Sequence, residues 1–440
     1  MSNVLVYFSS SFADIALNFE DNSLIKVIFN NKLLKIKLYD IYKAKIVDKS
    51  NSMGCFFVDL GENNLGILKF HKKNLHYIKG ESLLVQVIKE PIADSFNSFK
   101  NCVVSDDIFL MSSFFIYKPF GSNLIFSKNI SDNEKKDLSN KINLKNGGGF
   151  IRSSYKFNNK EVLISQINDL QDIWKDIFES NKSGFIYSED FFQRALFDNS
   201  KRIPSSVYIK SFGNINKEYC NNLGIKINHY FQKESILDFF NIKNELEILF
   251  SKNIYINDSL SLSITENEAF NYIDVNFKND NFFTSKEESL YKANTDILKN
   301  IIDVIILKNL SGQILIDLLK VNNKQYKDNI VNCAKRYLSA DGIKSFVLGF
   351  SNLGLLEISR QKMQISFNQD TDFLLAIDLM IFYTSLEHYL STHHNKAKIE
   401  ISECFLENLK IKSQSEFVLF NEKYSIDFIC NNNVKLYNFF

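Results

Sequence analysis

Closely spaced cysteine pairs are missing from this sequence. Its six cysteines are scattered along 440 residues, at Cys55, Cys102, Cys220, Cys333, Cys404 and Cys430. A disulfide-rich scaffold and a zinc knuckle both need cysteines at short, regular spacings, so the pattern predicts neither. We therefore expect reduced, buried thiols in a cytoplasmic protein.

An excess of charge of either sign is also missing. The sequence has 52 basic and 51 acidic side chains. The chain as a whole therefore has no electrostatic attraction to nucleic acid. Any site for a polyanion must be a local patch of basic residues.

Long uninterrupted apolar runs are absent as well. The longest apolar stretches, 301–319 and 373–386, are broken by charged residues such as Asp303, Lys308 and Asp378. We expect them to be core helices and strands, not membrane spans. Asp14 and Glu20 interrupt the N-terminal segment early, so no secretory signal is expected.

The residues that are present are those of a folded protein of several modules. Hydrophobic residues make up 45% and charged residues 23% of the chain, as in globular domains. By length, roughly three to five modules are expected. The patterns predict strands at Val4–Phe8, Ile15–Phe19 and Leu24–Phe29, and a long amphipathic helix at Glu161–Asn181 whose apolar stripe is a core face.

Residues 35–70 have a different pattern, with short alternating strands and glycines at 54, 61 and 66. This pattern is typical of a small antiparallel barrel. Lys43 and Lys45 lie on its first long strand, and Phe56 and Phe57 on the next. An aromatic ring beside cations is how such barrels hold single-stranded nucleic acid, and alternation favours Phe57 as the outward ring. The alternative is that both rings are structural and no RNA binds.

Two carboxylates interrupt apolar runs that otherwise read as buried strands. Asp274 lies in EAFNYIDVN (268–276) and Asp317 in QILIDLL (313–319). An ionised carboxylate away from water costs several kcal/mol unless it is compensated. Two of them on neighbouring strands predict a site for a hard cation such as Mg²⁺. The alternative is that both end their strands facing solvent or pair with lysine.

Several motifs occur together in one order. The stretches IYKAKIVDKSNSMGCFFVDLGENNLGILKF (41–70) and GESLLVQVIKE (80–90) resemble the RNA-binding barrel of the ribonuclease E/G family. The chain departs from the family at Ala44, where glycine is usual, and at Ile67, where a second aromatic ring is usual. By resemblance, Phe57, Lys43 and Lys45 contact RNA.

The segment NGGGFIRSS (146–154) resembles the family's pocket for the 5′-monophosphate of RNA. The resemblance implies that Arg152 and Ser153 hold this phosphate, with Lys128 nearby where the family often has arginines. A planar guanidinium beside a hydroxyl suits a terminal phosphate. The alternative is that the glycines only shape a turn and that Arg152 is a solvated strand residue.

The strongest match is to the family's catalytic domain. EAFNYIDVN, LKNLSG (307–312), QILIDLLKV (313–321) and NLGLLEISRQKM (352–363) follow one another in the family's order. The resemblance implies that Asp274 and Asp317 bind Mg²⁺, that Asn276 supports them, and that Lys344 is a basic residue near the active site. Lys320 replaces a second aspartate of the family's IDFIDM motif, and residues 277–278 replace a glycine and a serine.

The implied fold is an α+β multidomain chain. It comprises an RNase H-like domain (1–37 with 195–250), an OB-fold barrel (38–105), a 5′-sensor region (106–194), a DNase I-like α/β catalytic domain (251–365) and a small C-terminal α/β domain (372–440). The family's zinc-linking cysteines are absent from residues 363–371. No structural zinc is therefore expected, and any homo-oligomer must form without a cysteine zinc link.

The implied function is an Mg²⁺-dependent endoribonuclease that senses 5′-monophosphates. Its expected partner is single-stranded RNA, either ribosomal RNA precursors or messenger RNA, in RNA processing and decay. One alternative is a catalytically weak or inactive RNA-binding relative, which could associate with ribosomes and in which Lys320 has displaced the metal. Another is an interaction protein that docks on ribosomal particles through its barrel.

Overall fold

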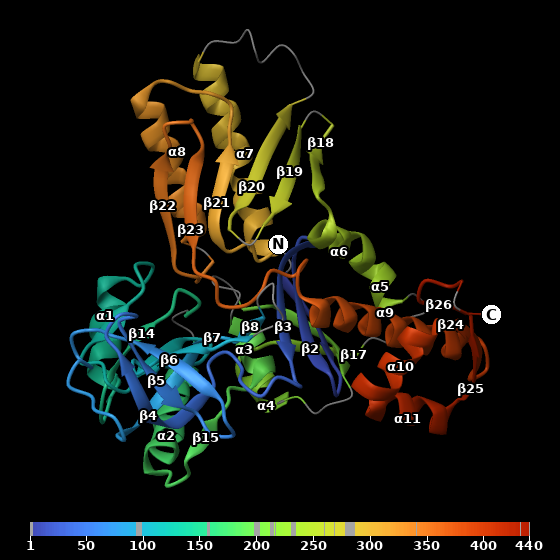
Figure 1. The fold of residues 1–440 in the computed structure, drawn as a ribbon, viewed down its shortest axis with the longest axis horizontal. Helices are drawn as coiled ribbons and strands as arrows, with labels where there is room; N and C mark the ends of the chain where they lie inside the picture. The colour runs from blue at the N-terminus through green and yellow to red at the C-terminus, as the bar shows by residue number, and fades with distance from the viewer. Residues whose placement is uncertain are drawn as a thin grey trace.

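The computed structural model describes residues 3–93, 99–155, 159–197, 203–211, 215, 217–229, 235–258, 260–267, 269–277, 287–339, 341–431 and 433–439. Figure 1 shows one sheet, packed against α7 (Glu287–Leu307) and α8 (Lys324–Leu338), standing above a broader body that holds the other sheets. The two ends of the described chain both lie in this body.

A mixed sheet of order β17-β16-β1-β2-β3 lies at the centre of the body. Its strands are β1 (Asn3–Ser9), β2 (Ala13–Glu20), β3 (Ser23–Asn31), β16 (Ser206–Ser211) and β17 (Lys226–His229). The three strands predicted near the N-terminus are confirmed. Both faces are apolar because both are covered: Leu5 packs towards α3 (Phe191–Phe197) and α4 (Lys217–Asn222), whereas Val6 packs towards helices on the other side.

A closed five-stranded barrel follows, and it agrees with the predicted OB-like barrel. Its strands run in the order β4-β5-β6-β10-β7, and β4 also pairs with β7, which closes the barrel. The bounds are β4 (Ile41–Ser50), β5 (Cys55–Asp59), β6 (Leu65–Lys69), β7 (Ser82–Lys89) and β10 (Cys102–Ser105), with β15 (Gly184–Tyr187) added beside β4. Between β7 and β10, two short strands, β8 (Ile92–Ala93) and β9 (Phe99–Lys100), pair with each other. Residues 94–98 lie outside the described residues.

A four-stranded sheet of order β11-β12-β14-β13 lies beside the barrel. Its strands are β11 (Leu110–Met111), β12 (Phe115–Lys118), β13 (Leu124–Phe126) and β14 (Gly148–Ile151). The predicted long helix is confirmed as α2 (Lys160–Glu179), and its apolar stripe packs on this sheet. A shorter helix, α1 (Asp132–Lys141), begins after Ser131, whose side chain forms a capping box with Glu134.

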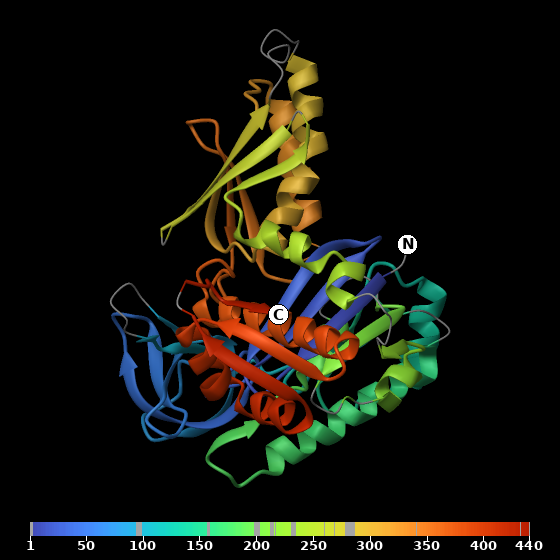
Figure 2. The same ribbon diagram turned by 90° about the vertical axis from the view of Figure 1, so that its right-hand side faces the viewer.

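The upper sheet has the order β18-β19-β20-β21-β23-β22. Its strands are β18 (Asn253–Asn257), β19 (Leu260–Glu266), β20 (Asn271–Phe277), β21 (Gly312–Asp317), β22 (Ser345–Phe350) and β23 (Leu356–Arg360). Helices α7 (Glu287–Leu307) and α8 (Lys324–Leu338) cover one face and form a core with it. Figure 2 shows both helices on one side of this sheet and no helix on the other side, which we call the open face.

The body and the upper sheet are joined by two short helices and a return segment. Helices α5 (Ile236–Phe239) and α6 (Ile242–Phe250) lead from the central sheet to β18. Residues 361–370 lead back from β23. Lys308 lies at this junction with only 1% of its surface exposed. Its Nζ donates to the carbonyl oxygens of Leu249 and Ser251 and lies 3.6 Å from Glu266 Oε1.

The C-terminal part packs on the central sheet. It contains α9 (Thr371–Thr392), β24 (Lys396–Ile401), α10 (Glu403–Lys412), α11 (Gln414–Lys423), β25 (Ser425–Cys430) and β26 (Tyr437–Phe439). Among the described residues, α9 is the one helix that is both long enough and apolar enough to cross a bilayer. However, 56% of its most apolar 18-residue window is buried inside the protein. Its buried side chains belong to the same core as β1 and β24, as expected of a core helix.

All six cysteines lie among the described residues and all are unpaired. Cys55, Cys102 and Cys220 are buried, as expected. The expectation is wrong for Cys404 and Cys430, which are exposed. They lie at the surface of the C-terminal part, where the expected fold did not predict which faces are covered.

Candidate active site

Asp274 and Asp317 occupy facing positions on adjacent parallel strands. β20 pairs with β21 so that Asp274 lies opposite Asp317. Their neighbours Ile273 and Ile316 are fully buried under α7 and α8. Because side chains alternate along a strand, both carboxylates lie on the open face, where both are half-buried. Within the described part of the chain, neither is paired with a lysine or an arginine, so the lysine-paired alternative does not apply there.

Tyr272 lies two residues before Asp274 on the same face. Its hydroxyl donates a hydrogen bond of 2.9 Å to Asp317 Oδ2. Burial, followed by this hydrogen bond and the charges of Asp317 and Asp274, raises the pKa of Tyr272 to about 12. The phenol is therefore a protonated donor at neutral pH. Sequence reasoning missed this residue, although the period of two from Tyr272 to Asp274 would have placed both on one face.

Asn294 fixes the chain just after Asp317. This fully buried side chain on α7 donates from Nδ2 to the Leu319 carbonyl oxygen at 2.7 Å, and its Oδ1 accepts from the Leu319 amide at 3.0 Å. A buried amide that meets both backbone groups of one residue holds that residue in one position. The segment after β21 is therefore anchored to α7. Lys320, the next residue, is exposed.

Of the two other predicted site residues, Asn276 lies near the aspartates and Lys344 does not. Asn276 is exposed on β20, two residues beyond Asp274, and shares the open face. Lys344 immediately precedes β22, whose Ser345 lies opposite Arg360, and Arg360 lies opposite Gly312 at the start of β21. At about 3.3 Å per residue, that end of the sheet is roughly 17 Å from Asp317. The motif match located Lys344 in the sequence. It did not show at which end of the sheet β22, the strand that follows Lys344, begins.

The two carboxylates fit a hard divalent cation. Mg²⁺ is usually held by one or two carboxylates together with waters and substrate phosphates. Asp274 and Asp317 supply two such groups side by side on an open face, and neither has a cationic partner among the described residues. No group of three or more histidine, cysteine or acidic residues that could hold a metal occurs in the described ranges. The pair therefore suits a cation that keeps open positions for substrate.

On the barrel, Phe56 and Phe57 face opposite sides. Phe56 is fully buried inside the barrel, whereas Phe57 is half-buried on the outside and lies opposite Ile67 of β6. Lys45 is exposed on β4. Lys43 is half-buried, and its Nζ donates to the Ser180 carbonyl oxygen at 3.2 Å. Phe57 and Lys45 thus share the outer face of the barrel, since Lys45 lies opposite Asp59, two residues beyond Phe57.

Arg152, Ser153 and Lys128 lie at the same edge of the four-stranded sheet. β13 and β14 are parallel, with Phe126 opposite Ile151, so the residues that follow both strands emerge together. Lys128 is exposed, and Arg152 and Ser153 are half-buried. The three residues predicted to hold a terminal phosphate therefore come from adjacent strand ends.

The glycine run before Arg152 is required by packing. A Cβ on Gly149 would lie 2.2 Å from the Phe115 ring and 2.5 Å from the Ile116 carbonyl oxygen. A Cβ on Gly148 would lie 2.5 Å from the Asn123 carbonyl oxygen. The glycines let β14 approach its neighbours closely. They have a structural role whether or not a phosphate binds beside them.

The chain is similar in sequence to known proteins. The family model described as Ribonuclease E/G family matches residues 110–363, a range that includes Arg152, Asp274 and Asp317. The chain is 24% identical to Ribonuclease G of Escherichia coli (strain K12) over 362 residues, which covers 74% of this chain and 73% of that protein. It is 25% identical to Ribonuclease G of Haemophilus influenzae over 363 residues, covering 74% and 73%. It is also 25% identical to a Ribonuclease E/G-like protein of Pyropia yezoensis over 375 residues, covering 78% and 72%.

Proposed function

The chain belongs to the ribonuclease E/G family, and from that premise we propose that it is an endoribonuclease that hydrolyses single-stranded RNA with Mg²⁺. The observation that carries this proposal is the facing position of Asp274 and Asp317 on parallel strands. Two carboxylates held side by side repel each other, and a cation bound between them would offset that repulsion. Similarity to proteins named Ribonuclease G supports RNA as the substrate.

Each residue of the site has a role in this proposal. Asp274 and Asp317 hold the cation, which when bound would polarise a phosphate and lower the pKa of a water. Tyr272 holds Oδ2 of Asp317 and so fixes the orientation of that carboxylate. Asn276, exposed on the same face, is within reach of a substrate lying across the sheet. Hydrolysis leaves a 3′-hydroxyl and a 5′-phosphate.

The remaining modules serve RNA binding in the same proposal. We assign the barrel (38–105) as an OB-fold that holds RNA on Phe57 and Lys45, with Lys43 beside them. Residues 106–194 act as a 5′-sensor through Arg152, Ser153 and Lys128. The central sheet is the RNase H-like domain, the upper sheet the DNase I-like catalytic domain (251–365), and residues 372–440 the small C-terminal domain. The unpaired cysteines are compatible with a cytoplasmic location.

A cleavage assay tests the proposal. The substrate is one RNA carrying either a 5′-monophosphate or a 5′-hydroxyl, incubated in Mg²⁺ with the parent protein, Asp274→Asn or Asp317→Asn. The parent should cleave both RNAs, and the monophosphorylated one faster, whereas each variant should lose at least a hundredfold in rate. Equal residual activity in all three proteins would overturn the catalytic assignment.

A non-catalytic RNA-binding relative is the second candidate. Lys320 favours it, because this exposed lysine stands three residues beyond Asp317 where the resemblance leads one to expect an acid. In that case the parent would bind single-stranded RNA with no Mg²⁺-dependent cleavage. The variant Lys320→Asp would then be the natural test of whether restoring the acid restores hydrolysis.

A further inference from the structure

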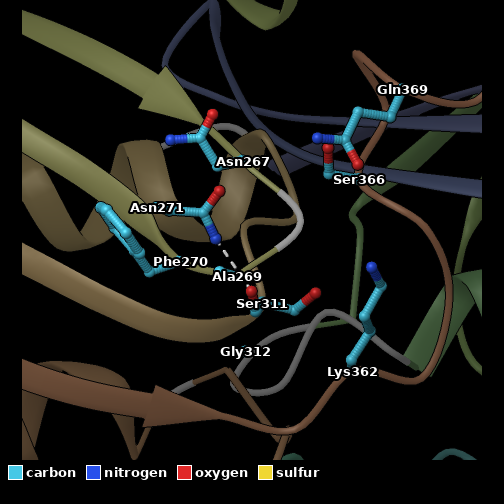
Figure 3. A pocket seen from close by; sticks show the side chains of 9 residues that line it. All are labelled: Asn267, Ala269, Phe270, Asn271, Ser311, Gly312, Lys362, Ser366 and Gln369. Atoms are coloured by element: carbon cyan, nitrogen blue, oxygen red, sulfur yellow. Dashed lines mark hydrogen bonds between the residues drawn. The ribbon is translucent and has the colours of Figure 1, made fainter. Parts of the chain in front are cut away.

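A small polar cavity lies at the base of the upper sheet, at the end away from Asp317. Its volume is about 40 Å³. The polar residues lining it are Asn267, Asn271, Ser311, Lys362, Ser366 and Gln369. Figure 3 shows these side chains around one space, with the Lys362 amino group and the Ser311 hydroxyl pointing towards it. None of the nine described residues that line it is acidic.

One hydroxyl group of the cavity has no hydrogen-bond partner among the described residues. Asn271 Nδ2 donates 2.8 Å to the Ser311 carbonyl oxygen. Ser311 Oγ is shielded from solvent and has no hydrogen-bond partner among the described residues. A buried hydroxyl left without a partner costs about 1–3 kcal/mol, and a bound acceptor would remove that cost. The amide groups of Asn267 and Gln369 line the same space.

Two described acidic residues near the cavity, Glu266 and Glu90, have partners of their own. Ser366 donates to Glu266 Oε2 at 2.6 Å, and Glu266 Oε1 lies 3.6 Å from buried Lys308. Glu90 accepts from the Leu38 amide at 3.0 Å and from Gln364 at 3.1 Å. Among the described residues that line the cavity, Lys362 is the charged one.

A second lysine extends the positive region towards the barrel. The pKa of Lys89, at the end of β7, is lowered by burial and then by the positive charges of Lys362, Lys100 and Lys69. The Glu90 amide donates to the Met363 carbonyl oxygen at 3.1 Å, which holds the barrel exit against the segment that carries Lys362. The cavity therefore lies beside a cluster of like charges, where an anion would be stabilised.

Size and position limit the anion. A water needs roughly 10–15 Å³ of such volume, so this cavity holds about three waters, enough for a phosphate group and too little for a nucleoside. Tyr272 and Asp274 alternate along β20, and Phe270, which also lines the cavity, immediately precedes this strand. At about 3.3 Å per residue, the four residues from Phe270 to Asp274 span at most about 13 Å. A polynucleotide crossing the open face from the aspartates would pass two aromatic rings and then reach the cavity.

We propose that this cavity is a subsite for a backbone phosphate of the RNA strand, held by Lys362, Ser311 and the neighbouring amides. The subsite rests on the proposed function, because it takes RNA as the polyanion on the open face. It adds a contact away from the cleaved bond and sets the direction in which the strand leaves the aspartates. Lys362 supplies the charge and Ser311 a directional donor.

Binding of a single-stranded RNA to the full chain carrying Asp274→Asn, measured without cleavage at several salt concentrations, tests the subsite. In this background, Lys362→Met should weaken binding of all sequences about equally. It should also reduce the slope of log K against log salt by about 0.7, the value for one phosphate contact on a single strand. Lys362→Arg should retain the slope. Lys335→Met, an exposed lysine on α8, is the matched control and should change neither quantity.

Replacing one phosphate at a time with a neutral methylphosphonate locates the contact. In the Asp274→Asn background, one position should weaken binding, and that effect should disappear when Lys362→Met or Ser311→Ala is added. A chain that binds no RNA at all would overturn the proposed function itself. A chain that binds RNA with the same salt slope and the same methylphosphonate pattern after Lys362→Met would overturn only the subsite.

Discussion

The hydroxyl of Tyr272 lies 2.9 Å from Oδ2 of Asp317 and donates a hydrogen bond to it. This contact links two adjacent strands across the open face. It leaves the other oxygen of Asp317 for different partners and places a protonated phenol beside both candidate metal ligands.

Removing this hydroxyl should lower the affinity for the cation more than it lowers the stability of the fold. A hydrogen bond to a charged group contributes about 1.5–3 kcal/mol, so in Tyr272→Phe we expect the Mg²⁺ concentration for half-maximal cleavage to rise about tenfold. Mn²⁺ binding followed by electron paramagnetic resonance should show the same shift. Tyr326→Phe on α8, which keeps its stacking with Tyr291, is the control. Equal Mn²⁺ affinity in parent and Tyr272→Phe would contradict the role given to Tyr272.

Asn294 should be needed for both stability and activity. In Asn294→Ala the amide and carbonyl of Leu319 lose their partners in a buried setting, at about 1–3 kcal/mol for each group. We expect the free energy of unfolding, measured in urea, to fall by about 3 kcal/mol. Cleavage at saturating Mg²⁺ should also fall, because the segment after Asp317 is no longer anchored. The exposed Asn421 on α11 provides a control, and Asn421→Ala should be within about 0.5 kcal/mol of the parent.

The two neighbouring phenylalanines of the barrel should separate folding from RNA binding. Phe56→Ala removes a ring from the barrel core and should lower the free energy of unfolding by about 3–5 kcal/mol. Phe57→Ala removes a half-buried outer ring and should weaken RNA binding by about 1–3 kcal/mol with a smaller change in stability. Fluorescence anisotropy and denaturant titration measure the two effects. Unchanged RNA affinity in Phe57→Ala would remove the barrel from the binding surface.

Adding one methyl group at Gly149 should disable the candidate 5′-sensor without touching the aspartates. The new Cβ would meet the Phe115 ring and the Ile116 carbonyl oxygen, and overpacking of this kind costs about 1–3 kcal/mol. We expect Gly149→Ala to lose the faster cleavage of 5′-monophosphorylated RNA while it keeps the rate on 5′-hydroxyl RNA. If the ratio of the two rates is the same as in the parent, the strand end at Arg152 does not sense the 5′ end.

The lysine cluster predicts a pH dependence of stability. Lys89 has a pKa below its ordinary 10.5, chiefly because of burial and then because of Lys362 and its neighbours. The unfolded chain therefore binds more protons at this residue than the folded chain, so its contribution to stability is full above pH 10.5 and is lost as the pH falls through the folded pKa. The free energy of unfolding of the parent, compared with Lys89→Met, should rise as the pH approaches 10.5. Parallel pH curves for the two proteins would contradict this.

Much of the upper sheet was predictable because its elements are strongly periodic. Helices α7 and α8 each bury a regular apolar stripe, which includes Ile297, Ile301 and Ile305 on α7 and Ile330 and Ala334 on α8. Asp274 and Asp317 were predicted as neighbours because each interrupts an apolar strand. Their register, one opposite the other, depends on pairing between segments more than 40 residues apart and could not be read from either segment alone.

Features made by distant segments were not predictable. The phosphate cavity combines residues from around 270, 311 and 366, and no local pattern marks them. Lys344 was expected near the aspartates, but the antiparallel arrangement of β22 and β23 puts it at the other end of the sheet. Tyr272 was overlooked for a different reason: a tyrosine inside an apolar strand fits a core position as well as a site.

The most direct test of the central claim is the position of a bound metal. Crystals of the protein soaked in Mn²⁺ and measured at the manganese absorption edge should show an anomalous peak in contact with both Asp274 and Asp317. The peak should be lost in Asp317→Asn crystals treated in the same way. At a Mn²⁺ concentration that supports cleavage, the absence of a peak between these carboxylates, or a peak that persists in Asp317→Asn, would contradict the assignment of this pair as the metal site.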